Sequence, residues 1–177
     1  MTPAPTTTID LASLSLSHGE GRRIEMPVRP GELELGGQVY ASATPEVGAK
    51  LDVSRSNSGY AFRLRFPVRL EGPCMRCLDP AGVDLEIEAR EVDQDRTGDE
   101  ELRSPYVEEG ELDIGRWAHD AMVLAMPPRL LCREECAGLC PVCGQSLNDA
   151  EPGAHDHGSE PDPRWAKLRE LQQPPPN

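Results

Sequence analysis

A dense cysteine cluster limits the folds open to this 177-residue chain more than any other feature. Four of its six cysteines fall between Cys132 and Cys143, with three, three and two residues between successive members, and Gly144 follows. Two cysteines separated by two residues can wrap a turn around one ion so that both thiolates point inward, and a following glycine lets the backbone close. The spacing therefore predicts a tetrahedral Zn²⁺ site.

Several neighbouring residues compete for places in this site. Cys140 and Cys143 form the central pair, Cys136 is the third candidate, and the fourth ligand is left open between a cysteine and two histidines. We assign the metal site to Cys132, Cys136, Cys140 and Cys143, with Cys74, Cys77, His155 and His157 as further candidates. Eight such ligands suffice for one zinc or for two, and the sequence leaves both open.

Disulfides and redox chemistry are the alternatives to metal binding. The first residues, Met-Thr-Pro-Ala-Pro, lack the basic and apolar segments of a secretory signal, so we expect a reducing, cytoplasmic setting that disfavours disulfides. Neither Cys74 nor Cys140 opens a helix after a strand, which disfavours a redox motif. No apolar run approaches the ~20 residues that a membrane span needs, so we expect a soluble protein without a membrane partner.

Alternating apolar residues predict a β-rich body over residues 9–128, after a disordered leader at 1–8 and with a polar loop at 17–31. In the clearest strand, apolar residues from Phe62 to Leu70 share one face, and the arginines share the other. Residues 83–89 form the next strand, which we expect to pair with it through the Cys74–Cys77 turn. These strands predict an antiparallel β-meander or a partly open barrel with one buried face.

The second half of the body supplies one helix. Residues 91–111 are acidic and rich in turn residues, which predicts a mobile loop. Asp113 suits an N-cap, and Leu112 and Trp117 suit a hydrophobic staple, so we expect a helix over 113–126 that covers the sheet. The fold class is therefore α+β. A cysteine-rich metal module is expected over 129–158, and a helical turn with a tail over 159–177.

Taken together, these motifs resemble the YceD family of large ribosomal RNA subunit accumulation proteins. The resemblance rests on the Cys74-Met-Arg-Cys77-Leu turn after a basic strand, the Gly-Leu-Cys-Pro-Val-Cys-Gly stretch ending at Gly144, and the closing Asp162-Pro-Arg-Trp-Ala-Lys-Leu. It implies a role in the accumulation and processing of large-subunit ribosomal RNA in bacteria and plastids. Members often end the second cluster with Cys-x-Cys, a place that His155-Asp-His157 takes here. The resemblance implies no catalytic residue.

The charge of the chain bears on this implied role. With 31 acidic and 18 basic residues, the net charge is -13, which opposes long-range attraction to a phosphate backbone. The candidate RNA contacts are the arginines of the early strands, Arg63, Arg65, Arg69 and Arg76. The alternative is that Asp84, Glu86 and Glu88 neutralise them across the strands. A basic ribosomal protein is then the other partner that the charge allows.

Three function classes follow. We expect a noncatalytic ribosome-biogenesis factor that acts on the large (23S) ribosomal RNA or its precursor particle, with a structural zinc. The alternatives are a zinc-ribbon adaptor that binds transcription machinery, and a metal-dependent enzyme. The sequence contains no HExxH, P-loop or GxSxG motif, and thiolate-rich zinc sites are more often closed and structural than catalytic. We therefore do not expect an enzyme.

Overall fold

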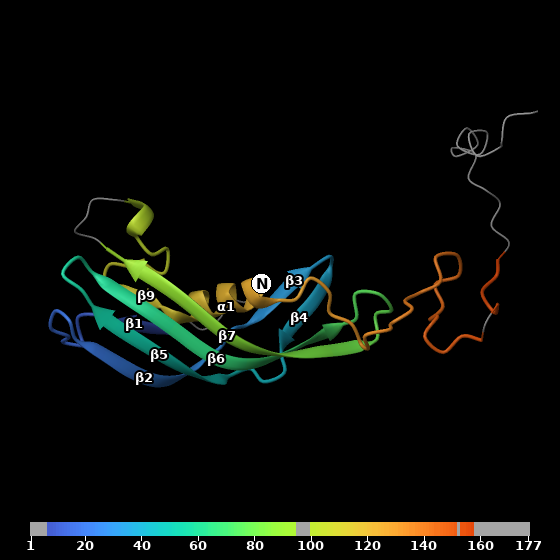
Figure 1. Cartoon of the computed structure of the whole chain (residues 1–177), viewed down its shortest axis with the longest axis horizontal. Coiled ribbons are helices and arrows are strands. Elements are labelled where there is room, and N and C mark those ends of the chain that lie inside the picture. Colours follow the sequence, from blue (N-terminus) through green and yellow to red (C-terminus); the bar gives the residue numbers. More distant parts are fainter. Residues whose placement is uncertain (1–6, 95–99, 152, 158–177) are drawn as a thin grey trace, which may run out of the picture. The chain divides into compact units, whose positions relative to one another are not determined.

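A computed structural model describes residues 7–94, 100–151 and 153–157 (Figure 1). The chain divides into two compact units, Met1–Glu134 and Glu135–Asn177, which we describe separately. Within the described residues, no helix has both the length and the apolar character to cross a bilayer.

The described residues of the first unit form two antiparallel sheets and one α-helix. Its strands are β1 (Thr8–Asp10), β2 (Gly21–Val28), β3 (Glu32–Leu35), β4 (Gln38–Ser42), β5 (Val47–Arg55), β6 (Tyr60–Pro73), β7 (Pro80–Asp93), β8 (Val107–Glu108) and β9 (Glu111–Asp113); a short 3₁₀ turn, η1, spans Glu100–Leu102, and α1 spans Ile114–Ala125. The fold is therefore α+β and mostly antiparallel sheet, as the sequence predicts.

Strand β6 organises the larger sheet. Of its six strands, five run in the order β2-β5-β6-β4-β3, and the sixth, β7, pairs with β6 along its whole length. On its other side, β6 pairs with β5 near its start and with β4 near its end. The period-2 alternation of β6 explains this central place, because its inward-facing residues, Phe62, Leu64, Phe66, Val68 and Leu70, are all at most 3% exposed. The β6–β7 hairpin through the first cysteine pair confirms the expected pairing.

Helix α1 covers the buried face of the sheet (Figure 1). It begins after Asp113, whose side-chain oxygen accepts a hydrogen bond from the Arg116 N–H at 3.0 Å, so the predicted N-cap is confirmed. Trp117 is 1% exposed and meets Phe62 of β6 edge to face, with ring centroids 6.3 Å apart. The helix therefore completes one apolar core with the sheet.

Two segments expected to be loops contain strands. Residues 17–31 include β2, which pairs with β5 in the register Ile24↔Leu51. The charges of Arg22, Arg23 and Glu25 hide the alternation there, since only the inward residues, ending at Val28, are apolar. The expectation of a loop over this whole range is wrong, because pairing with β5 overrides the weak local pattern.

The acidic segment 91–111 is likewise more ordered than expected where it is described. Strand β7 continues to Asp93, whose carboxylate is buried and accepts hydrogen bonds from the Ser104 N–H at 3.1 Å and from Arg103. Strands β8 and β9 follow. A buried carboxylate with such partners ties the segment to the sheet. Residues 95–99, 1–6 of the expected leader and the expected turn and tail at 159–177 lie outside the described residues; Thr8 opens β1.

Candidate metal centres

The first cysteine pair forms the turn that joins β6 to β7. The Cys74 N–H donates to the Asp79 carbonyl at 2.7 Å, and the Leu78 N–H donates to the Cys74 carbonyl at 3.0 Å. Leu78 has a left-handed backbone, with φ of 65°. The Arg76 N–H donates to the Cys74 sulfur at 3.4 Å. The turn therefore curls around this sulfur with backbone N–H groups directed at it.

The second pair forms the same turn in the second unit. The Cys140 N–H donates to the Gln145 carbonyl at 2.8 Å, and the Gly144 N–H donates to the Cys140 carbonyl at 2.8 Å. Gly144 has φ of 71°, matching Leu78 of the first turn. We call these turns, residues 74–79 and 140–145, the first and second knuckles. Their hydrogen bonds correspond position by position, although their first cysteines are 66 positions apart in the sequence.

The knuckle N–H groups favour thiolates. Burial opposes ionisation of Cys74, but N–H donors led by Arg76 and Cys77 hold the pKa of its thiol down at about 6. In the second knuckle, the N–H groups of Cys143 and Val142 lower the pKa of Cys140 to about 7. Thiolates are the form of cysteine that binds metals. Each knuckle therefore presents one sulfur that is prepared for a cation.

Cys77 behaves differently from its partner in the first knuckle. Its thiol lies 3.2 Å from a carboxylate oxygen of Asp79, to which it donates. Burial, with the help of that carboxylate, raises the pKa of Cys77 to about 12. A divalent cation deprotonates its thiol ligands outright, so this proton does not prevent Cys77 from acting as a ligand.

A third cysteine joins the first knuckle inside the first unit. After α1, the Leu130 carbonyl accepts a hydrogen bond from the Met75 N–H at 2.9 Å, and buried Leu130 packs in the core. This anchor brings the Cys132 sulfur to 3.5 Å from the Cys77 sulfur. The sulfurs of Cys74, Cys77 and Cys132 all lie within 4.8 Å of one another. Cys136 follows at the start of the second unit and is buried.

The second knuckle gathers two histidines. The ligand atoms of Cys140, Cys143, His155 and His157 all lie within 4.8 Å of one another. The Cys143 sulfur is 3.4 Å from Nδ1 of His155. Cys140 is buried, whereas Cys143 is exposed. This arrangement offers two sulfurs and two ring nitrogens, a common donor set for zinc.

The sequence left open whether one ion or two are bound, and the structure places the assigned cysteines beside different knuckles. Cys132 lies with the upstream pair, and Cys140 and Cys143 lie with His155 and His157. Of the further candidates, Cys74 and Cys77 form the first knuckle, and His155 and His157 lie beside the second. Closeness in sequence suggested that the downstream cysteines share one ion, but the β6–β7 hairpin carries the first knuckle to the segment after α1.

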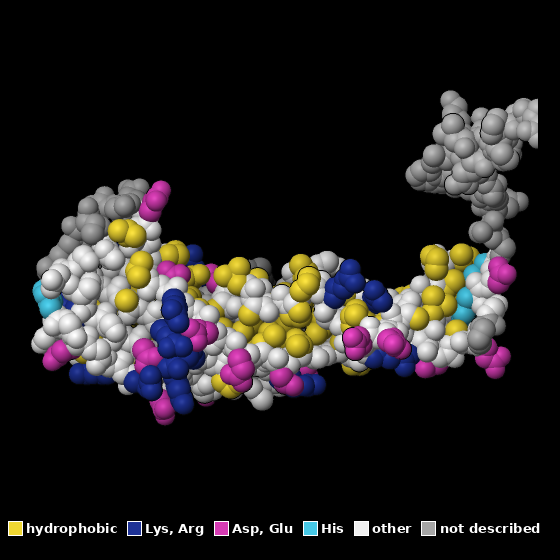
Figure 2. Space-filling view, in the orientation of Figure 1, with side chains coloured by type: hydrophobic (Ala, Val, Ile, Leu, Met, Phe, Trp, Pro, Cys, Tyr) yellow, Lys and Arg dark blue, Asp and Glu magenta, His cyan; other side chains and the backbone are white. Residues whose placement is uncertain are grey.

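The candidate RNA-contacting arginines make ion pairs. Arg63 meets Glu88 at 2.6 Å, Arg65 meets Asp52 at 2.6 Å, and Arg69 meets Glu71 and Asp84, each at 3.0 Å. Figure 2 shows Lys and Arg side chains gathered beside Asp and Glu side chains on this face. Arg76 also has an interaction partner. These pairs support the alternative that acidic residues offset the arginine strand.

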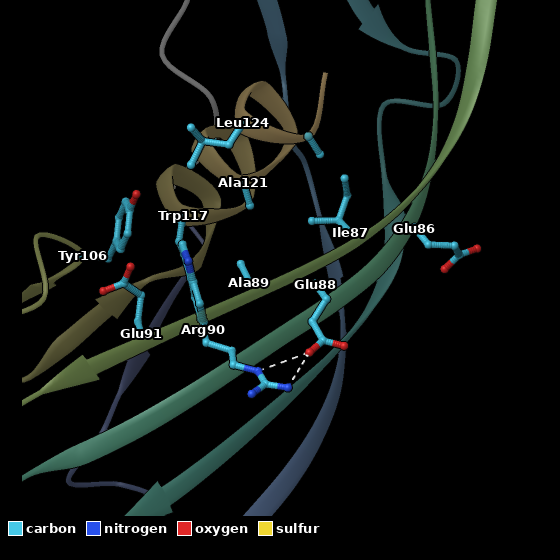
Figure 3. Close-up of a pocket in the computed structure, with 11 residues that line it drawn as sticks. Glu86, Ile87, Glu88, Ala89, Arg90, Glu91, Tyr106, Trp117, Ala121 and Leu124 are labelled. Atoms are coloured by element: carbon cyan, nitrogen blue, oxygen red, sulfur yellow. Dashed lines mark hydrogen bonds and ion pairs between the residues drawn. The ribbon is translucent and has the colours of Figure 1, made fainter. Parts of the chain in front are cut away.

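A groove of about 430 Å³ runs between α1 and β7 (Figure 3). Apolar side chains, among them Ile87, Ala121 and Leu124, line it, while Glu88 and Arg90 form an ion pair on the opposite side of β7. Burial raises the pKa of Glu91 at one end. No pattern in the sequence predicts this groove. The alternation of β7 identified its inward residues, but the position of α1 over them is a tertiary contact.

The fold and these sites define a small α+β protein, built mainly of antiparallel sheet, that carries two groups of soft metal ligands. The family model described as "Large ribosomal RNA subunit accumulation protein YceD" matches residues 62–172, more than half of the chain. The chain belongs to the YceD family. The matched segment includes both knuckles, α1 and every candidate ligand.

Curated relatives occur in mycobacteria. An uncharacterized protein of Mycobacterium tuberculosis is 38% identical over 106 residues, which cover 56% of this chain and 49% of the relative. An uncharacterized protein of Mycobacterium leprae is 32% identical over 106 residues, covering 57% of this chain and 48% of the relative. The match thus spans about half the length of these relatives. No solved structure matches the chain.

Proposed function

We propose that this protein is a noncatalytic, cytoplasmic factor that supports the accumulation of large-subunit (23S) ribosomal RNA. The observation that carries the proposal is the extent of the family match, which includes most of the β6–β7 hairpin, α1 and both knuckles. The segment that matches the family therefore includes all the candidate metal ligands. Closed thiolate sites are typical of structural metal ions, and this supports a scaffold in place of an enzyme.

We further propose a structural zinc ion at the first knuckle. Cys74, Cys77 and Cys132, whose sulfurs all lie within 4.8 Å of one another, supply three thiolates within the first unit. Thiolate-rich zinc sites are typically structural and closed to substrate. The ion then links the β6–β7 hairpin to the segment that follows α1. This link fixes the start of the metal-stabilised module that we propose for residues 129–158.

For the partner, we propose basic ribosomal proteins of the large-subunit precursor. The net charge of -13 favours a basic partner, and the ion pairs of Arg63, Arg65 and Arg69 leave these cations already matched by carboxylates. Direct contact with precursor ribosomal RNA is the competing outcome. It requires the phosphates to displace Asp52, Asp84 and Glu88 from their arginines.

The test is depletion of the protein in cells that make it, followed by sucrose-gradient separation of ribosomal particles. We expect the ratio of 23S to 16S ribosomal RNA to fall and the protein to migrate with large-subunit precursors. Complementation with Cys77→Ser is expected to fail, whereas Leu78→Ser, an exposed neighbour that is not a ligand, restores the ratio.

Other outcomes would reject the proposal. An unchanged ratio of 23S to 16S ribosomal RNA would contradict the role in ribosome biogenesis. Migration with RNA polymerase that survives RNase treatment would instead favour a zinc-ribbon adaptor, and metal-dependent turnover by the purified protein would favour an enzyme. Crosslinking in cells then separates the two partners, because it recovers either ribosomal proteins or fragments of precursor RNA.

A further inference from the structure

We propose that the second unit holds a metal ion of its own, of the Zn²⁺ class, between Cys140, Cys143, His155 and His157, and that this ion is what folds the unit. The inference goes beyond the proposed function, which needs only the first site. It rests on three independent features of the described part of the second unit. These are the distances between the ligand atoms, the lack of an apolar core, and the hydrogen bonds that define the two pieces linked by the ion.

The ligand distances suit a tetrahedral ion. With Zn–S of about 2.3 Å and Zn–N of about 2.0–2.1 Å, a tetrahedral zinc holds a sulfur and a nitrogen about 3.6 Å apart. The Cys143 sulfur and His155 Nδ1 lie 3.4 Å apart, and all four ligand atoms fall within 4.8 Å of one another. The rings of His155 and His157 stand 5.8 Å apart between centroids. Both imidazoles can therefore approach one ion from different directions.

The described part of the second unit has almost no apolar core. Among residues 135–151 and 153–157, the buried residues are Cys136, Gly138 and Cys140, and the sole β pairing is the bridge Leu139↔Ser146. Val142, the apolar residue at the tip of the knuckle, is 70% exposed. A segment this short cannot offset its loss of chain entropy without a crosslink or a metal ion. Among the described residues of this unit, no disulfide joins the cysteines, which leaves the metal ion as the crosslink that we propose.

The hydrogen bonds define the two pieces of the second unit that the ion would link. The Leu147 N–H donates to the Gly138 carbonyl at 2.8 Å, and the Ala137 N–H donates to the Asn148 side chain at 2.9 Å, so residues 137–148 form a small hairpin with the knuckle at its tip. A separate turn at 153–157 carries both histidines. Because the ligands come from both pieces, binding of the ion and folding of the unit are one event.

The two sites also differ in exposure. In the first unit, Cys74 is 0% exposed and Cys77 is 5% exposed. In the second unit, Cys143 and His157 are exposed. A chelator must displace ligands one by one to remove an ion, and it reaches exposed ligands more easily. We therefore expect the second ion to leave first.

The experiment uses the full-length protein without an affinity tag, purified and loaded with Zn²⁺ alone. Elemental analysis is expected to find two ions per chain. Cys143→Ser should lose one ion, and the matched control Val142→Ser, an exposed residue of the same knuckle that is not a ligand, should keep both. Cys77→Ser should lose the other ion, the one that the proposed function uses.

Amide hydrogen exchange then tests the coupling to folding. In Cys143→Ser, we expect the amides of Cys140 and Gly144 to exchange at least tenfold faster, because their hydrogen bonds depend on the ion. The corresponding amides of the first knuckle, Cys74 and Leu78, serve as the internal control and should stay protected on the long hairpin.

The results that overturn this inference are distinct from those that overturn the proposed function. A single ion that is lost in Cys77→Ser but kept in Cys143→Ser would remove the second site and leave the proposed function intact. Unchanged exchange at Cys140 and Gly144 after loss of the ion would show that the unit folds without it, which contradicts the inference. The ribosomal RNA ratio is not a readout in either case.

Discussion

Gly72 shows how one residue sets the packing of a strand. The Tyr40 side chain of β4 lies against the Gly72 backbone of β6, and a Cβ atom at Gly72 would lie 2.3 Å from Cδ1 of the ring. Tyr40 is 2% exposed, although β4 pairs with β6 at only Ala41↔Glu71 and Ser42↔Leu70. The ring packed on glycine therefore supplies much of what holds β4 to the sheet.

We expect Gly72→Ala to lower the free energy of unfolding by about 1–3 kcal/mol, because the new methyl group must displace the buried ring. The measurement is urea denaturation monitored by circular dichroism. Gly48→Ala in β5 is the control, since a Cβ atom there has no neighbour within 4 Å. Equal midpoints for the two variants would show that Tyr40 does not depend on the glycine.

At the scale of the element, the small sheet β1-β9-β8 contains one row of apolar cross-strand neighbours and one row of acidic cross-strand neighbours. Buried Leu112 of β9 stands opposite Ile9 and Val107, while Glu111 stands opposite Asp10 and Glu108. Like charges directly opposite one another destabilise a sheet. The apolar row must therefore offset this repulsion.

Replacing Glu111 by Lys should stabilise the protein by about 0.2–1 kcal/mol per cross-strand pair at low ionic strength, because two repulsions become attractions. Thermal unfolding in low and high salt would test this, and added salt should shrink the gain. Glu34→Lys in β3, whose partner is the apolar Val39, is the control and should bring no such gain. A stabilisation that persists in high salt would contradict the electrostatic explanation.

At the scale of the whole molecule, ion pairs cross four strands of the larger sheet. Asp52 of β5 bridges Arg23 of β2 and Arg65 of β6, each at 2.6 Å. Glu88 of β7 bridges Arg63 of β6 at 2.6 Å and Arg90 at 2.8 Å. This network uses the arginines within the fold. The excess negative charge of the chain therefore dominates its long-range field.

The same network predicts a pH dependence. Hydrogen bonds from Arg63 and then Arg90 lower the pKa of Glu88 from 4.5 to about 2. A lowered carboxylate pKa means that ionised Glu88 stabilises the fold above pH 4.5 and that this contribution is lost as the pH falls toward 2. Glu88→Gln should therefore lose less stability than the wild type over this interval, as measured by denaturant unfolding at a series of pH values.

The control for the pH experiment is Glu86→Gln, two residues earlier on β7 and, within the described part of the chain, outside the ion pairs. It should follow the wild-type pH profile. If Glu88→Gln and the wild type lose stability equally, other carboxylates control the acid response. Because Glu88 is exposed, added salt should also weaken the difference.

The sequence by itself determined the parts of this protein that local patterns encode. Period-2 alternation identified β6 and β7, the cap at Asp113 identified α1, and the cysteine spacing identified the positions of both knuckles. The motifs around these cysteines also identified the family. Each of these patterns acts over a few residues, so it can be read without knowing the rest of the fold.

Only the tertiary structure decided which of these parts meet. Cys74 and Cys132 are 58 positions apart in the sequence, and their sulfurs lie within 4.8 Å of each other because the β6–β7 hairpin and the anchor at Leu130 bring them together. Strand β2 exists because β5 offers it a partner, and the groove exists because α1 lies over β7. Such long-range pairings depend on the summed burial and hydrogen bonding of distant segments, which no local pattern records.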